Sequence, residues 1–304
     1  MCSPQVIEEA RNGISRRGFL KLAGAAAVVG TAVGTVGPVR HAQAQSGVAR
    51  ALGGEFVVQD LTHVLGPDFP VFPGYDPMRI EDFTTIEEDG FNSKQLSFNE
   101  HTGTHMDAPV HFSAGGETAD RLSPERFFAP LAVVDISGRA ASDDDAAVTM
   151  DDILIWEEQH GSLPAGVFVA MYSGWEERIS EPGAFVNADD SDTPHFPGFG
   201  PEVAKFLISE RDVVGVGVDT LSLDIGASQD FGAHNTVLPA GKYGLENLAN
   251  LGRVGPSGAA ILVGGPKHEG ATGGPSRVFA ISGSSLPDTG GESVEDLAGR
   301  FGPH

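Results

Sequence analysis

The chain has 304 residues, of which 42 are acidic and 19 are basic, giving a formal net charge of -23 at pH 7. A surface this acidic repels nucleic acid and anionic membranes, so neither is expected as a partner. The single cysteine excludes a disulfide framework and a thiolate-rich metal site. Any metal site must therefore be built from histidine, aspartate, glutamate or asparagine.

Residues 1–44 are predicted to be an export signal that is separate from the folded domain. Residues 15–21, with the sequence SRRGFLK, contain a twin-arginine motif, and residues 22–36 form an apolar run. Small residues at 42–44 fit a cleavage site, so we expect cleavage there and no stable membrane insertion afterwards. The alternative is a retained anchor, although the apolar run is short for a membrane span. The twin-arginine export machinery is then a partner, and residues 45–304 are expected in the periplasm or outside the cell.

Short runs rich in Val, Ile and Phe alternate with helical patterns along the mature chain. Strands are predicted at residues 56–61, 132–136, 166–172, 213–218, 259–263 and 277–281. A helix is predicted to begin at Pro201 and to end at residue 210, with shorter helices at residues 151–160 and 245–251. This order predicts one α/β domain. Periodicity alone leaves open whether the sheet is mixed or doubly wound.

Residues 101–111, with the sequence HTGTHMDAPVH, hold three histidines and an aspartate, a density that indicates a metal site. Alternate side chains of an extended segment lie on the same face, so His101, His105 and Asp107 are predicted to point the same way. Gly103 lacks a side chain and is predicted to leave a gap for an ion. The alternative is a histidine-rich strand whose side chains are satisfied by hydrogen bonds.

The end of this motif is predicted to place one more histidine beside the metal ligands. Pro109 argues against a helix and turns the chain, so that His111 can lie beside the ligands. Imidazole and carboxylate ligands suit Zn, Mn, Fe or Co, and the two oxygens of Asp107 can bridge two ions. A binuclear site is therefore compatible with the motif.

The pattern His-x-Gly-Thr-His-x-Asp-x-Pro-x-His resembles the signature of the metal-dependent cyclase superfamily, which contains bacterial kynurenine formamidases and isatin hydrolases. The similarity extends over about residues 57–283. It implies that His111 is the catalytic base, and two-metal members add a histidine and a glutamate twelve residues beyond it. The metal ligands implied by the resemblance are His101, His105, Asp107, His234 and Glu246.

The resemblance also implies a fold and an activity. The fold would be a single α/β domain with a mixed, barrel-like central sheet flanked by helices, in a homo-oligomer with two Zn or Mn ions. Isatin hydrolases lack part of the second metal set, so Glu246 favours the formamidase branch. The expected activity is that of an arylformamidase, which converts N-formylkynurenine or a similar aryl formamide to an amine and formate.

Two alternatives to this activity remain open. One is a hydrolase or cyclase of the same fold that acts on a cyclic amide, a lactone or a polyketide. The other is an exported metal-binding protein without catalysis, against which His111 argues, because simple ion capture needs no base.

Overall fold

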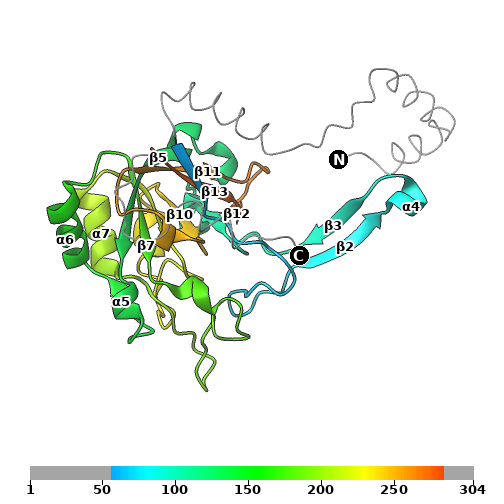
Figure 1. The fold of residues 1–304 in the computed structure, drawn as a ribbon, viewed down its shortest axis with the longest axis horizontal. Helices are drawn as coiled ribbons and strands as arrows, with labels where there is room; N and C mark the ends of the chain where they lie inside the picture. Colours follow the sequence, from blue (N-terminus) through cyan, green and yellow to red (C-terminus); the bar gives the residue numbers. More distant parts are fainter. Residues whose placement is uncertain (1–55, 284–304) are drawn as a thin grey trace, which may run out of the picture. The chain divides into compact units, whose positions relative to one another are not determined.

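The computed structural model describes residues 56–283, which fold around a nine-stranded, curled half-barrel sheet (Figure 1). In sheet order the strands are β1 (Phe56–Asp60), β13 (Arg277–Gly283), β11 (Ala259–Gly264), β5 (Phe128–Asp135), β7 (Val167–Tyr172), β9 (Val213–Val218), β10 (Tyr243–Glu246), β4 (His105–Asp107) and β12 (Gly273–Pro275). Strands β5, β7, β9 and β10 are parallel, and all other neighbours pair antiparallel. The sheet is therefore mixed and barrel-like, as predicted, and it contains all six predicted strands.

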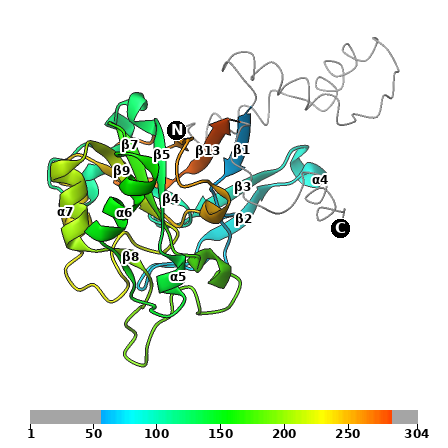
Figure 2. The same ribbon diagram turned by 60° about the vertical axis from the view of Figure 1, so that its left-hand side comes forward.

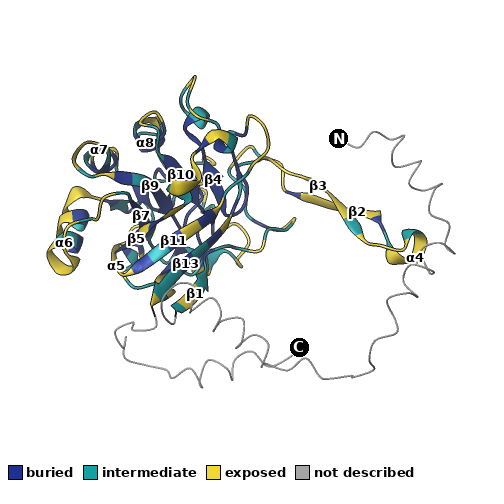
Figure 3. Cartoon of the chain, turned by 90° about the horizontal axis from the view of Figure 1, so that it is seen from above, coloured by how far each residue is buried: buried dark blue, intermediate teal, exposed yellow. Residues whose placement is uncertain are grey.

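Helices cover one face of this sheet, where α6, α7 and α8 lie side by side (Figure 3). The described α-helices are α4 (Ile86–Asp89), α5 (Ser137–Ala140), α6 (Met150–His160), α7 (Pro201–Glu210) and α8 (His234–Val237). In β7, Val167, Val169 and Met171 pack toward the helices, whereas Phe168 and Ala170 pack into the core on the opposite face. Because both faces of β7 are buried, its sequence is a continuous apolar run without alternation.

The two longer helices begin where local chemistry favours them. At the start of α6, the Thr149 hydroxyl accepts from the backbone N–H of Asp152, whose carboxylate accepts from the backbone N–H of Thr149. Helix α7 begins at Pro201 and buries Val203 and Leu207 against the sheet. The helices predicted at these two places are confirmed.

The helix predicted at residues 245–251 is wrong. Tyr243–Glu246 form β10, and a turn follows in which Asn247 and Asn250 have φ angles of 55° and 56°. An α-helix cannot pass through residues in this left-handed conformation. Glu246 therefore lies on a strand, directly opposite His105 of β4.

A hairpin of β2 (Arg79–Thr84) and β3 (Ser93–Ser97), with α4 at its tip, projects from the sheet (Figures 1 and 2). We call residues 79–98 the arm. Its exposed large apolar side chains are Ile80, Phe83, Ile86, Phe91, Leu96 and Phe98. The sequence patterns did not predict this hairpin. A second two-stranded sheet pairs β6 (Ala147–Val148) with β8 (Gly198–Phe199).

The predicted export signal lies outside the described residues, so its boundary and cleavage stay predictions. Within residues 56–283, no helix combines the length and the apolar character needed to cross a membrane.

Candidate metal centre

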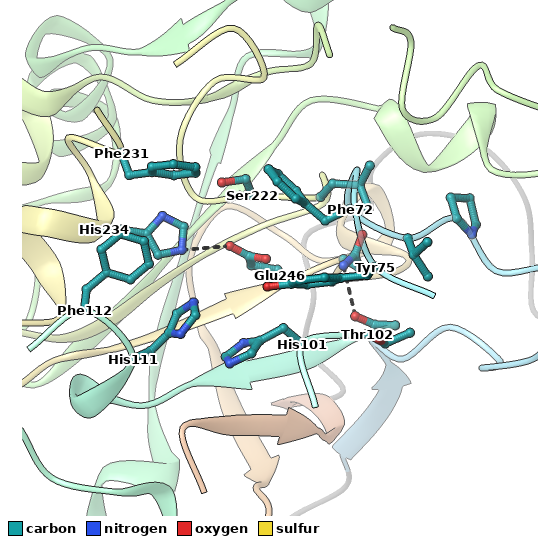
Figure 4. A pocket seen from close by; sticks show the side chains of 15 residues that line it. Phe72, Tyr75, His101, Thr102, His111, Phe112, Ser222, Phe231, His234 and Glu246 are labelled. Carbon is teal, nitrogen blue, oxygen red and sulfur yellow. Dashed lines mark hydrogen bonds and ion pairs between the residues drawn. The ribbon is translucent and has the colours of Figure 1, made fainter. Parts of the chain in front are cut away.

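The structure brings all six residues of the predicted site together: four of them line one pocket (Figure 4), and the buried His105 and Asp107 lie in contact with these four. They are His101 from the loop before β4, His105 and Asp107 from β4, His111 from the turn after it, His234 from α8 and Glu246 from β10. The antiparallel pairing of β4 with β10 explains how residues so distant in sequence meet. Folding therefore brings together predicted site residues that lie up to about 145 positions apart in the sequence.

His105 and His234 each contact both Asp107 and Glu246, through different carboxylate oxygens. The Nε2 atom of His105 lies 3.3 Å from Oε2 of Glu246 and 3.4 Å from Oδ1 of Asp107. The Nε2 atom of His234 lies 3.2 Å from Oε1 of Glu246 and 3.4 Å from Oδ2 of Asp107. Tetrahedral ligands at bond lengths of about 2.0–2.2 Å are separated by about 3.3–3.6 Å. The spacings among His105, Asp107 and Glu246 therefore fit three ligands of one divalent ion.

Two unpaired buried atoms support the same conclusion. His105 Nε2 and Asp107 Oδ2 are buried and have no hydrogen-bond partner. His105 Nδ1 donates to the carbonyl oxygen of Gly103 at 2.8 Å, which leaves Nε2 with a free lone pair. Buried polar atoms without partners are costly, and a cation would satisfy both of these. The residues present fit a divalent metal.

The electrostatics of the cluster favour positive charge. Burial lowers the pKa of His105, but the neighbouring carboxylates of Asp107 and Glu246 outweigh it and raise the pKa to about 9. The pKa of His234 is also raised, against its burial, by Asp107, Asp224 and Glu246. Two buried carboxylates thus stabilise protons here, and a divalent ion would compete for the same place.

Asp107 also belongs to a second group of potential ligands. Ligand atoms of His101, Asp107 and His111 all lie within 4.8 Å of one another. His101 Nδ1 lies 2.6 Å from Asp107 Oδ1, while its Nε2 lies 2.9 Å from the hydroxyl of Thr272. Asp107 stands between the two groups, which is the place of a carboxylate that can bridge two ions.

His111 differs from His105 and His234 in the direction in which its pKa is shifted. Its ring stacks on His101 with centroids 3.8 Å apart. Burial lowers the pKa of His111 to about 4, although the charge of Asp107 opposes this shift. The imidazole is therefore neutral at pH 7 and can accept a proton, as a general base must.

The predicted role of Gly103 is wrong. A side chain there would meet Leu65, with Cδ1 3.0 Å from the added Cβ, so the space is filled by the chain itself. The φ angle of Gly103 is 70°, a conformation that glycine adopts freely. The extended strand begins only at His105, and His101 reaches the cluster from a loop.

Sequence reasoning missed Asp224. Its buried Oδ2 accepts from His234 Nδ1 at 2.6 Å, and Oδ1 accepts from the backbone N–H of Ala233 at 2.6 Å. It therefore fixes the tautomer of His234 and directs Nε2 to Glu246. No residue spacing in the sequence marked it as a partner of His234.

Aromatic side chains form the pocket walls and were also largely missed. The Phe112 ring lies 4.6 Å from His234 and 5.7 Å from Phe231, and Phe231 lies 6.5 Å from Phe72. Figure 4 shows these rings on both sides of the histidines and Glu246. The pocket thus joins an apolar wall to a polar floor.

Comparisons with known proteins identify the family of this chain. A family profile described as putative cyclase matches residues 59–225. The chain belongs to the cyclase family. It is 36% identical over 251 residues to the isatin hydrolase of Roseibium aggregatum, covering 77% of this chain and 94% of that protein. A kynurenine formamidase of Bacillus cytotoxicus is 28% identical over 194 residues, covering 62% of this chain and 80% of that protein.

Solved structures of cyclase-family proteins give the same result. Isatin hydrolase A from Ralstonia solanacearum has a TM-score of 0.73 at 36% identity, covering 83% of this chain and 100% of that one. An isatin hydrolase bound to the product analogue thioisatinate has a TM-score of 0.73 at 33% identity, covering 81% of this chain and 99% of that one. The chain is therefore a metal-dependent hydrolase of the cyclase family. The expected arylformamidase specificity is not confirmed. This chain shares more sequence identity with the isatin hydrolase of Roseibium aggregatum than with the kynurenine formamidase.

Proposed function

We propose that this cyclase-family protein hydrolyses an aromatic cyclic amide of the isatin type. The observation that carries the proposal is a cavity of about 120 Å³ with aromatic walls and a floor of His and Glu side chains. A flat aromatic amide can pack against Phe72 and Phe231 while its carbonyl group faces the metal ligands. The identity to isatin hydrolases supports this substrate class.

A divalent ion held by His105, Asp107, His234 and Glu246 would lower the pKa of water toward about 7 and polarise a carbonyl group. The chain supplies the remaining chemistry. Neutral His111 takes a proton from the attacking water and returns it to the leaving nitrogen. The surrounding phenylalanines exclude bulk water from the reaction.

The test is a substrate panel with protein loaded with Zn or Mn. Isatin, an N-formyl aryl amine and an aromatic lactone are compared by product analysis, with metal content measured for each preparation. We expect the highest kcat/KM with isatin. Failure of the metal-loaded protein to hydrolyse any amide would overturn the proposal.

Hydrolysis of an aryl formamide is the second candidate. The observation that favours it is the pair of His234 and Glu246, whose Nε2 and Oε1 atoms lie 3.2 Å apart. This pair matches the second metal set of formamidases in the resemblance described above. Higher kcat/KM with N-formylkynurenine than with isatin would decide for this candidate.

We propose export separately, from the twin-arginine motif at residues 15–21, the apolar run at 22–36 and the small residues at 42–44. A receptor reads the twin arginines, so changing Arg16 and Arg17 to Lys should keep the precursor in the cytoplasm. Cell fractionation measures this. Normal export of the double variant would contradict the proposal that residues 15–21 are an export signal.

A further inference from the structure

Tyr75 places a phenol in the pocket, in addition to the candidate metal ligands and the base. The residue lines the cavity together with His101, His111 and Glu246. Figure 4 shows its ring across the pocket, with the hydroxyl end directed toward Glu246 and the histidines. No hydrogen bond to this hydroxyl is found within residues 56–283. A donor directed into a binding cavity without a protein partner is available to a ligand.

The electrostatics agree with this placement. Burial raises the pKa of Tyr75, and the charges of Glu246 and Asp107 raise it further, while His234 opposes them. These charges act on the phenol because it lies near the candidate metal ligands. A phenol has an ordinary pKa of about 10, so Tyr75 keeps its proton at neutral pH and remains a hydrogen-bond donor.

The backbone holds Tyr75 in place through a tight turn. The backbone N–H of Tyr75 donates to the carbonyl oxygen of Phe72 at 3.0 Å, and the two rings lie 6.2 Å apart. Gly74, with a φ angle of 95°, allows the turn. A fixed donor loses little orientational freedom when a substrate binds, which is what stabilisation of a transition state requires.

We propose that Tyr75 is a catalytic residue that donates a hydrogen bond to the reacting carbonyl oxygen of the amide. The inference rests on the proposed function. Water oxygen bonds to the carbonyl carbon, His111 takes its proton, and the π electron pair moves onto the carbonyl oxygen. That oxygen then carries negative charge and accepts a stronger hydrogen bond from Tyr75.

The second half of the reaction restores both residues. The carbonyl bond re-forms, the C–N bond breaks, and the nitrogen receives the proton held by His111. Tyr75 keeps its own proton throughout. Its hydrogen bond is therefore strongest in the charged intermediate, which predicts an effect on kcat rather than on KM.

The test is Tyr75→Phe, which removes the hydroxyl and keeps the ring. Loss of one such donor lowers kcat by about 100-fold to 1,000-fold. We expect KM to change by less than about threefold, since ground-state packing is retained. Metal content and thermal unfolding should match the wild type. An unchanged kcat, or loss of bound metal, would overturn the role.

Tyr172→Phe is the matched control, because Tyr172 ends β7 and is absent from the pocket lining. The kcat of the Tyr172→Phe protein should stay within about twofold of the wild-type value. Tyr243 is a poorer control, because its buried hydroxyl donates to the Arg126 carbonyl oxygen. A similar loss of kcat in Tyr172→Phe would overturn a role specific to Tyr75.

A binding measurement separates this inference from the proposed function. An aromatic phosphonamidate has a tetrahedral, anionic oxygen at the position of the charged carbonyl oxygen. Calorimetry should show at least about tenfold weaker binding to metal-loaded Tyr75→Phe than to the wild type. Equal affinity would overturn the role of Tyr75. Absence of amide hydrolysis by the wild type would instead overturn the proposed function.

Discussion

Beside the pocket, Met106 of β4 and Leu245 of β10 are completely buried, whereas six large apolar side chains of the arm are at least 38% exposed. Around the pocket, the buried atoms without hydrogen-bond partners are polar, and they include His105 Nε2 and Asp107 Oδ2. Within residues 56–283, no apolar surface covers these side chains of the arm, whereas the polar atoms at the pocket suit a cation. The two regions of one chain therefore point to different kinds of binding, one to an ion and the other to a protein surface.

The largest expected effect is at the centre of the pocket. Asp107→Ala removes the carboxylate shared by both ligand groups, so metal and activity should be lost together. Elemental analysis and turnover of the best amide measure this. Asp82→Ala, on the exposed arm, is the matched control and should keep both. An Asp107→Ala protein with normal metal content would contradict the assignment.

His111→Ala tests whether chemistry can be separated from metal binding within the same pocket. It removes the neutral imidazole, so activity should fall by about 100-fold to 10,000-fold while metal content stays near the wild-type value. If the variant loses its metal as completely as Asp107→Ala does, His111 is a ligand. Full turnover would exclude His111 as the base.

The pH dependence gives a milder test of the same histidine. The pKa of His111 is lowered from 6.5 to about 4, so the neutral form that acts as a base persists to lower pH. We expect kcat/KM to hold between pH 7 and about pH 5 and to fall only as the pH approaches about 4. Metal content measured at each pH separates this loss from ligand protonation. An acid limb centred at 6.5 would contradict the environment described.

The smallest effect on the domain itself is expected from the arm. A two-stranded hairpin is marginally stable alone, and the twenty residues of the arm approach the size of one side of a standard interface. We expect self-association through the arm, with a second copy covering its apolar side chains. Phe83→Asp with Phe91→Asp should give a monomer in sedimentation and change the unfolding free energy of the protomer by less than about 0.5 kcal/mol.

The control for the arm is Ile155→Asp, on the exposed side of α6, which should leave the sedimentation coefficient unchanged. A monomeric wild type would show that the predicted homo-oligomer does not form. Association that persists in the arm variant would place the interface elsewhere.

The sequence predicted the parts of the fold in which local chemistry and tertiary structure agree. Strand β7 is apolar throughout because it is buried on both faces, and α7 begins at its proline. Strand β4 has only three residues, which is too short for a periodic pattern. Glu246 was placed in a helix because the left-handed conformation of Asn247 leaves little trace in composition.

The site was predicted unevenly for a related reason. His105 and Asp107 belong to one compact motif, so their spacing could be read directly. Tyr75 and Phe231 enter the pocket from separate loops, and Asp224 acts only through its contact with His234. Such residues are defined by three-dimensional proximity, which a single sequence does not contain.

The register of β4 against β10 links metal binding to folding of the whole chain. Glu246 lies opposite His105, and a one-residue slip would turn its side chain to the other face of the sheet. An unfolded chain keeps His105 near Asp107 but separates both from Glu246 by a long, flexible loop. An ion that binds all three therefore acts as a reversible cross-link between distant segments. Its binding energy adds to the stability of the native register, and a chelator should lower the unfolding temperature of the entire domain.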